Sequence, residues 1–175
     1  MPIAVGEVSG NGLRAAMTVS TILGALRTLP AASPGELLRA LNRMLAGQLQ
    51  GGFVTCCVAH IAPSGTVTAA NVGHLAPYRN GEEIALESGL PLGVTTDADY
   101  AESALTLVPG DILTFVSDGV VEAKSAAGEL FGFERTCLIS GHSAEQIAAA
   151  AQQFGQEDDI TVLTLTFAPA GVLHA

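Results

Sequence analysis

Hydrophobic positions recur along this chain with two different periods, which predict helices in some segments and strands in others. Residues 13–29 carry apolar side chains near helical spacing and end before Pro30, a residue that cannot continue a helix. A second helix is expected from Ser33, a typical N-cap residue, with Pro34 at the first helical position and Glu36 three residues after the cap. Two consecutive helices are therefore expected near the N-terminus.

Apolar runs of strand length occur in the rest of the chain, and many are rich in β-branched and aromatic residues. Ser143 and Gln146 mark the start of a further helix over residues 147–154, whereas residues 131–133 are expected to form a loop. Because no repeat or linker interrupts the pattern, one domain is expected over residues 1–168, followed by a frayed tail over 169–175. The strands are expected over residues 2–5, 53–61, 66–72, 82–87, 103–108, 112–117 and 160–167.

The run over residues 112–117 is the most strongly strand-like of these segments, and it ends at Asp118-Gly119. A carboxylate at the end of a buried strand is held rigidly, and the glycine lets the backbone turn sharply beside it. This arrangement is typical of a metal ligand. The alternative is that Asp118 caps a short helix by accepting hydrogen bonds from the amides of Val120 and Val121.

Composition narrows the possible partners. The chain has 175 residues, 49% hydrophobic and only 14% charged, which indicates a compact globular protein with a sizeable core. Its formal net charge of −10 argues against nucleic-acid binding and leaves no basic patch for anionic lipid. No apolar run is long enough to cross a membrane. Cys56, Cys57 and Cys137 are read as reduced thiols, so a cytoplasmic protein is expected.

Acidic residues stand beside predicted strands at three places in the sequence. Glu7 lies in a glycine-rich turn expected over residues 6–12, Asp118 follows the strand over residues 112–117, and Asp158 and Asp159 precede the last strand. Carboxylates brought together repel one another unless a cation lies between them. A cluster of oxygen ligands selects Mg²⁺ or Mn²⁺, on which water can become a nucleophile for phosphorus.

Other polar residues support weaker inferences. His74, which follows Gly73 in a predicted turn, could act as a catalytic base or contact phosphate, although a histidine in this setting more often hydrogen-bonds the backbone. Asp97 and Asp99 lie in a predicted loop. Solvation is their expected role, with metal binding as the lesser alternative.

Several short motifs together resemble one known family, the SpoIIE-type branch of the metal-dependent (PPM) serine/threonine protein phosphatases. They occur in the order typical of that family and extend over nearly the whole chain. The first is Gly6-Glu7-Val8-Ser9-Gly10-Asn11-Gly12, where the family typically has Gly-Asp-Val-Ser-Gly-His-Gly. The others are Asn71-Val72-Gly73-His74, Gly89-Leu90-Pro91-Leu92-Gly93, Pro109-Gly110-Asp111, Ser117-Asp118-Gly119-Val120-Val121-Glu122-Ala123, Gly128-Glu129-Leu130-Phe131-Gly132 and Asp158-Asp159-Ile160-Thr161-Val162.

The resemblance implies a fold and a set of site residues. The fold is α+β, an α-β-β-α sandwich of two mainly antiparallel sheets flanked by helices, with two Mn²⁺ or Mg²⁺ ions at one end. By position, Glu7 stands where the family has its bridging aspartate, and the Val8 carbonyl would be the backbone ligand beside it. Asp118 and Asp158 match the remaining side-chain ligands, and Asp159 is the less favoured of the adjacent pair. Glu7, Asp118 and Asp158 are therefore the predicted catalytic residues.

The resemblance also implies an activity, which is hydrolysis of phosphoserine or phosphothreonine on a regulatory protein by a metal-activated water. The substrate class suggested is an anti-sigma-factor antagonist or a similar bacterial regulator, and the domain could form a homodimer. Two alternatives remain open at this point. One is a pseudophosphatase that binds a partner protein with weak or no catalysis, and the other is an acidic structural domain whose three turns lie far apart.

Two departures from the family pattern favour the pseudophosphatase alternative. Glu7 replaces an aspartate and is one methylene longer, and Asn11 replaces a histidine. The family domain also usually has an upstream segment with strands and acidic residues near the metals. The chain is therefore expected to be truncated at its N-terminus relative to the family.

Overall fold

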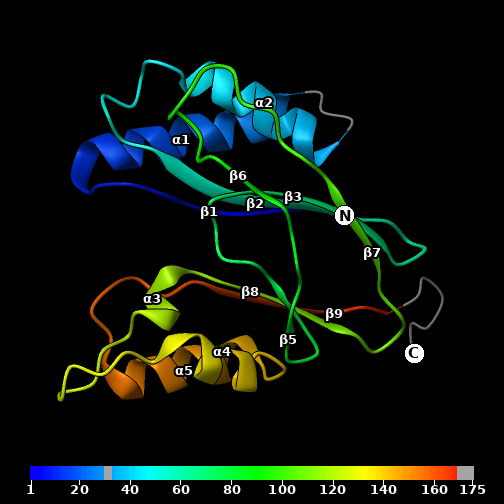
Figure 1. Ribbon diagram of the computed structural model, residues 1–175, viewed down its shortest axis with the longest axis vertical. Coiled ribbons are helices and arrows are strands. Elements are labelled where there is room, and N and C mark those ends of the chain that lie inside the picture. Colours follow the sequence, from blue (N-terminus) through cyan, green and yellow to red (C-terminus); the bar gives the residue numbers. More distant parts are fainter. Residues whose placement is uncertain (30–32, 169–175) are drawn as a thin grey trace. The chain divides into compact units, whose positions relative to one another are not determined.

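The computed structural model describes residues 1–29 and 33–168, and it has an α+β fold (Figure 1). Two sheets are present, each mainly antiparallel and each accompanied by helices, so the expected fold class is confirmed. The chain forms two compact units. The first contains residues 1–74 and 86–106, and the second contains residues 75–85 and the described residues from 107 onward. The tail expected over residues 169–175 lies outside the described residues.

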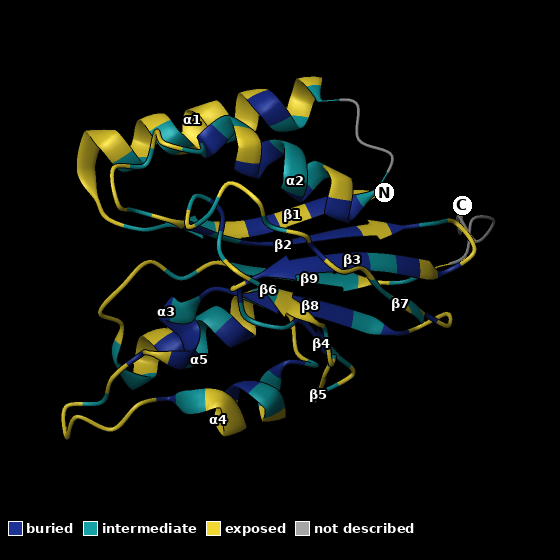
Figure 2. Ribbon diagram, turned by 45° about the horizontal axis from the view of Figure 1, so that its top comes forward, coloured by how far each residue is buried: buried dark blue, intermediate teal, exposed yellow. Residues whose placement is uncertain are grey.

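The sheet of the first unit is built around three antiparallel neighbours, β1, β2 and β3. Its strands are β1 (Pro2–Val8), β2 (Val54–Ile61), β3 (Thr66–Val72), β6 (Ser88–Gly89) and β7 (Ser103–Thr106). On β3, β6 pairs in parallel and β7 pairs antiparallel. β2 and β3, which correspond to the strands expected over residues 53–61 and 66–72, pair as an antiparallel hairpin, and both are buried along much of their length (Figure 2).

The first strand is longer than the sequence analysis predicted. It was expected to end at residue 5, but β1 continues because Gly6, Glu7 and Val8 pair with Cys56, Thr55 and Val54. Gly6 makes this close pairing feasible, since a Cβ added there would lie 2.5 Å from the Thr55 carbonyl oxygen. Glu7 and Val8 are therefore strand residues rather than turn residues.

Helices α1 (Gly12–Thr28) and α2 (Pro34–Leu45) lie on one face of this sheet (Figure 1). Both predicted helices are confirmed. The Ser33 hydroxyl accepts a hydrogen bond from the Glu36 amide at 3.4 Å, as expected of an N-cap. Leucines of α2 fill the core between helix and sheet, whereas most of α1 is exposed and only Ala25 is buried.

The sheet of the second unit has the strand order β5-β4-β8-β9, antiparallel throughout. These strands are β4 (Tyr78–Arg79), β5 (Glu82–Glu83), β8 (Ile112–Val116) and β9 (Val162–Thr166). The strand expected over residues 82–87 is wrong in length. Only two residues of it form β5, because β4, its partner, is itself only two residues long. The central strand β8 matches the run that the sequence marked most strongly.

Three helices belong to the second unit: α3 (Asp118–Val121), α4 (Gly132–Ile139) and α5 (Ala144–Gly155). The start of α5 is confirmed in detail, because Ser143 and Gln146 form a reciprocal capping box. The loop expected over residues 131–133 is wrong, since α4 begins at Gly132. Phe131 is buried just before it and packs edge-to-face on Phe154, with ring centroids 5.3 Å apart.

Asp111 ties the start of β8 to the loops around it. Its carboxylate accepts hydrogen bonds from the Asn80 side chain and the Val108 amide, each at 2.7 Å, and pairs with Arg79 at 2.6 Å. These interactions, with the Asn80 hydrogen bond the largest, hold the pKa of Asp111 below its ordinary value. The buried acid thus anchors the strand that leads to Asp118.

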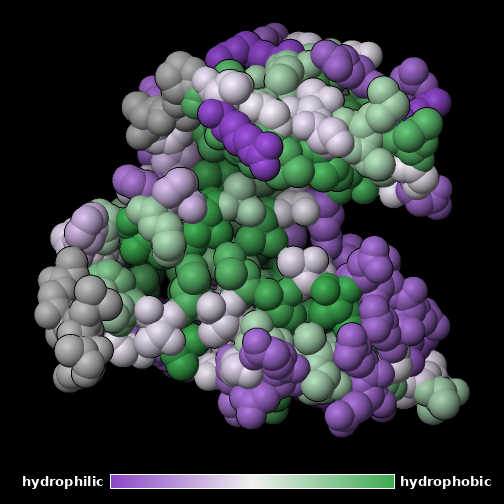
Figure 3. Space-filling model, turned by 180° about the vertical axis from the view of Figure 1, so that it is seen from behind, coloured by the Kyte–Doolittle hydropathy of each residue, from purple (hydrophilic) through white to green (hydrophobic). Residues whose placement is uncertain are grey.

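The face of the molecule seen in Figure 3 carries both hydrophilic and hydrophobic residues. One hydrophobic core centres on α2 with β2 and β3, and another on α3 and α5 with β8. Within residues 1–29 and 33–168, no helix has both the length and the apolar character needed to cross a membrane.

Candidate functional site

The first group of predicted site residues lies at the end of β1. Glu7 faces Thr55 across the β1–β2 pair, and its side chain is 32% exposed. Its carboxylate oxygen Oε2 lies 3.8 Å from Nδ1 of His74. Val8, whose carbonyl is the predicted backbone ligand, is the last residue of the strand. Rigid pairing with β2 thus fixes where both residues stand.

His74 has a larger part in this group than the sequence analysis favoured. Its backbone is clamped by Asn71, whose side chain accepts from the His74 amide at 3.1 Å and donates to the His74 carbonyl at 2.8 Å. Backbone hydrogen bonding is therefore as expected, but Nδ1 of the ring also lies near Glu7 and 3.4 Å from the Thr55 hydroxyl. No local sequence pattern indicates this contact, because β1 and residue 74 are far apart in the chain.

The second group is built on the end of β8. Asp118 is the first residue of α3, so the N-cap position proposed for it in the alternative interpretation falls to Ser117. Gly119 is buried, and a Cβ added there would lie 2.2 Å from the carbonyl oxygen of Asp159 and 3.5 Å from that of Asp158. The two acidic turns of this unit therefore meet, backbone against backbone, at a place where only glycine fits.

Ser117 connects the end of β8 to the segment that follows Asp158 through three hydrogen bonds. Its hydroxyl accepts from the Thr161 amide at 2.9 Å and donates to the Asp159 carbonyl at 3.3 Å, while its own amide donates to the Thr161 carbonyl at 2.9 Å. In the sequence, Ser117 is the last residue of a predicted strand and the first residue of a family motif, and neither reveals these hydrogen bonds. Its position immediately before an Asp-Gly pair was the available signal, since serine readily hydrogen-bonds nearby backbone.

The Asp158-Asp159 turn is further organised from within. Oδ1 of Asp158 accepts from the Asp159 amide at 2.7 Å, and the Gln156 side chain donates to the Asp158 carbonyl at 2.8 Å. Both aspartates are exposed. The turn therefore presents two carboxylates to solvent from a backbone that is held in place at several points.

The structure thus gathers the predicted residues into two sets. Glu7 and Val8 belong to the first unit, whereas Asp118, Asp158 and Asp159 belong to the second. Over the described residues, no three His, Cys, Asp or Glu side chains form a ready metal-binding group. The donors themselves fit Mg²⁺ or Mn²⁺, because all are oxygens. Gly119 has no side chain that could fill the space beside Asp158 and Asp159. That the two sets share one site stays a prediction.

Known proteins resemble this chain in sequence and in fold. The model of the family described as Stage II sporulation protein E (SpoIIE) matches residues 1–168. The phosphoserine phosphatase RsbU of Bacillus subtilis (strain 168) is 30% identical over 182 residues, covering 93% of this chain and 54% of RsbU. The chain therefore spans about half the length of this curated relative.

Solved structures agree with the fold. The PP2C domain of SiaA from Pseudomonas aeruginosa superimposes with a TM-score of 0.77 at 21% identity, over 95% of this chain and 76% of that one. The catalytic domain of the serine/threonine protein phosphatase PstP, solved in complex with two manganese ions, gives a TM-score of 0.67 at 17% identity, over 93% and 86% of the two chains. At these identities the likeness concerns the fold alone.

Proposed function

The chain belongs to the SpoIIE family, and from this premise we propose that residues 1–168 act as one metal-dependent phosphatase domain that hydrolyses phosphoserine or phosphothreonine on a regulatory protein. The observation that supports this most directly is the junction at Gly119, which sets Asp118 beside Asp158 and Asp159 with no room for a side chain between their backbones. The three residues near this backbone junction all carry carboxylates, which are the oxygen ligands that a hard cation prefers.

In this proposal each residue has a separate task. Glu7, the Val8 carbonyl, Asp118 and Asp158 would hold Mn²⁺ or Mg²⁺, with Asp159 the less favoured of the adjacent pair. When bound, the ions would lower the pKa of a water so that it can attack phosphorus. His74 would orient the Glu7 carboxylate, since its Nδ1 lies 3.8 Å from that group.

The proposed substrate is a phosphorylated bacterial regulator, such as an anti-sigma-factor antagonist, acted on in the cytoplasm. The description of RsbU as a phosphoserine phosphatase supports the phosphoserine part of this proposal. The acidic balance of the chain, −10 overall, is compatible with collecting divalent cations and with a protein rather than a nucleic-acid partner. A homodimer is compatible with this proposal as well.

A second candidate function is a protein-binding module with weak or no catalysis. The observation that favours it is Glu7 itself. This residue stands where the family has a shorter aspartate, and its Oε2 lies 3.8 Å from Nδ1 of His74. In that case the same surface would still bind the phosphoprotein, but turnover would be absent at any metal concentration.

The test is hydrolysis of p-nitrophenyl phosphate and of a phosphoserine peptide, with Mn²⁺ and with EDTA, by the wild-type chain and by Asp118→Asn. We expect Mn²⁺-dependent turnover in the wild type and a loss of at least about a hundredfold in the variant, because losing a direct ligand should exceed the cost of losing an outer-shell partner. Its melting temperature should be unchanged or higher, since removing one carboxylate relieves repulsion in the metal-free protein.

The matched control is Asp97→Asn, a charge removal of the same kind at an exposed position outside both acidic sets. It should keep full activity. Full Mn²⁺-dependent turnover by Asp118→Asn would remove Asp118 from the metal site. A wild-type chain that hydrolyses neither compound at saturating Mn²⁺ would instead favour the binding module.

A further inference from the structure

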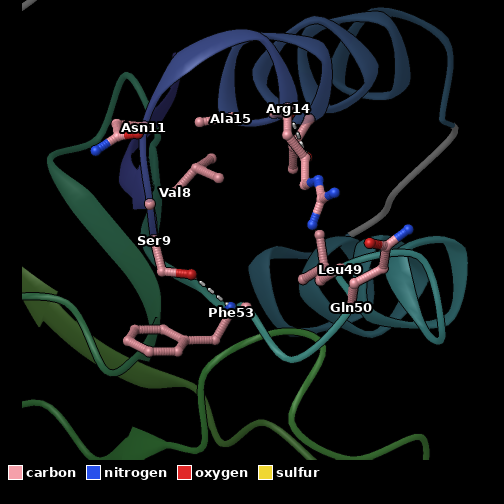
Figure 4. A pocket seen from close by; sticks show the side chains of 11 residues that line it. Val8, Ser9, Asn11, Arg14, Ala15, Leu49, Gln50 and Phe53 are labelled. Carbon is pink, nitrogen blue, oxygen red and sulfur yellow. Dashed lines mark hydrogen bonds between the residues drawn. The ribbon is translucent and has the colours of Figure 1, made fainter.

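A cavity of about 330 Å³ opens directly beside the predicted ligand Val8, entirely within the first unit (Figure 4). Three segments surround it: the residues that follow β1, the first turns of α1, and the turn that follows α2. The residues used below are Val8, Ser9, Arg14, Leu49, Gln50 and Phe53, all of which line it. Nothing in the proposed chemistry at the acidic residues uses this space.

Hydrogen bonds give the cavity a fixed floor. The Ser9 hydroxyl accepts from the Phe53 amide at 2.7 Å, and the Ser9 amide donates to the Phe53 carbonyl at 2.9 Å (Figure 4). A Cβ on Gly52 would lie 2.9 Å from the Ser9 hydroxyl oxygen, so the turn approaches as closely as glycine permits. The cavity is therefore preformed, which limits the entropic cost of binding a ligand there.

One charged side chain enters this cavity, the guanidinium of Arg14, which extends from α1 toward Leu49 and Gln50 (Figure 4). Across the described residues it has neither an ion pair nor a side-chain hydrogen bond. By contrast, four of the seven Lys and Arg residues in the chain pair with acids: Arg39, Arg79, Lys124 and Arg135. An unpaired arginine in a hollow of so acidic a protein is suited to an anionic ligand that comes from outside.

We propose that this cavity is a specificity subsite in which Arg14 binds an acidic side chain of the phosphoprotein substrate. The inference rests on the proposed function. Because Val8 both lines the cavity and supplies a predicted metal ligand, the phosphate itself would be held at the ions, and the cavity would receive a residue near the phosphoserine. The amide of Gln50, at the cavity wall, offers a neutral hydrogen-bond donor beside the guanidinium.

A neighbouring hollow favours a polypeptide ligand over a small free anion. This second hollow, of about 500 Å³, shares Arg14 with the cavity and is lined by the exposed apolar residues Leu13 and Met17. An extended peptide that placed a carboxylate at Arg14 would therefore have apolar surface to contact on its next residues. A lone anion would leave that surface unused.

The experiment uses short phosphoserine peptides in which a single glutamate is moved along a glycine–alanine background, each with a glutamine counterpart. Hydrolysis gives KM and kcat, and fluorescence anisotropy of labelled peptides in EDTA gives a Kd that needs no turnover. For at least one glutamate position we expect KM and Kd to fall by roughly two- to fivefold with kcat unchanged, as for an exposed ion pair. The preference should shrink at high salt.

Variants decide whether Arg14 is responsible. Arg14→Gln should abolish the glutamate preference, and Arg14→Glu should transfer it to peptides with lysine at the same position. Arg27→Gln is the matched control, since Arg27 is an exposed cation of the same helix that does not line the cavity. It should keep both the preference and the turnover of p-nitrophenyl phosphate.

Two results would overturn the subsite: no glutamate position is preferred in either assay, or Arg14→Gln keeps the preference in full. Failure of the proposed function would look different. If the wild type hydrolyses nothing but still binds the glutamate peptides more tightly through Arg14, the subsite stands and the catalytic proposal falls.

Discussion

Glu7 is the residue at which the sequence departs most consequentially from its family, and the structure shows what surrounds it. The strand pairing of Glu7 with Thr55 fixes its backbone, so the carboxylate can adjust only through its side-chain torsions. One of its oxygens lies 3.8 Å from the buried ring of His74. A longer side chain with a second partner is less free to adopt the narrow distances that Mg²⁺ requires, about 2.0–2.1 Å.

We therefore predict that Glu7→Asp lowers the metal concentration needed for half-maximal activity, or raises the activity itself. The shorter side chain restores the ligand length typical of the family and withdraws the carboxylate from His74. The wild type should also work better with Mn²⁺ than with Mg²⁺, whose octahedral geometry is the stricter. The measurement is a titration of p-nitrophenyl phosphate hydrolysis with each metal.

Glu7→Gln is the control for side-chain length, because it keeps the length of the wild-type residue but removes its charge. It should need far more metal than either acid. Identical titration curves for wild type and Glu7→Asp, with high activity in both, would mean that Glu7 does not contact the ions directly.

At the scale of elements, those predicted well are the ones whose signals lie within a few residues. The start of α2 at Ser33 and the capping box of α5 are local hydrogen-bond patterns, and the sequence alone specifies them. The strand β8 was predictable for a similar reason, since β-branched and aromatic residues are enriched in strands and follow one another in this segment.

The missed features depend on contacts between distant segments. Gly6, Glu7 and Val8 read as a turn because of nearby glycines, yet pairing with β2, nearly fifty residues away, makes them a strand. Helix α4 was missed because only Thr136 of its residues is buried while Phe133 and Leu138 are exposed, so its apolar positions do not mark one buried face. Likewise, no local pattern could place His74 beside Glu7.

The junction of α3 with the Asp158-Asp159 turn yields a prediction at this scale. Gly119→Ala should destabilise the protein by about 2–3 kcal/mol, because the new Cβ would lie 2.2 Å from the Asp159 carbonyl oxygen and one backbone must move. The same displacement should weaken Mn²⁺-dependent hydrolysis. Urea denaturation and the p-nitrophenyl phosphate assay measure the two effects.

Gly24→Ala is a suitable comparison, since Gly24 lies within α1 and an added Cβ meets no atom of another segment within 4 Å. It should stabilise the helix by up to about 1 kcal/mol. If Gly119→Ala were as stable as the wild type, the close approach of the two acidic turns would not exist in solution.

For the molecule as a whole, the charge of its carboxylates makes the free energy of unfolding depend on pH. A net charge of −10 means that many carboxylates repel one another at neutral pH, and protonating exposed ones relieves that repulsion. Asp111 behaves in the opposite way. It is buried and held by Asn80, the Val108 amide and Arg79, so protonation would remove favourable interactions.

The last prediction separates Asp111 from the acidic surface around it. Because its pKa is lowered in the folded protein, its stabilising contribution should be fully present above the unfolded value, about 3.9, and should be lost as the pH falls through the folded value. Asp111→Asn should therefore have a clearly lower urea midpoint than the wild type at pH 7. Both proteins share every other charge, so subtracting their stabilities at each pH cancels the shared surface and leaves Asp111. The difference should stay level down to about pH 4 and shrink in more acidic buffer. A difference that is constant at every pH would assign the effect of Asp111 to packing rather than to its charge.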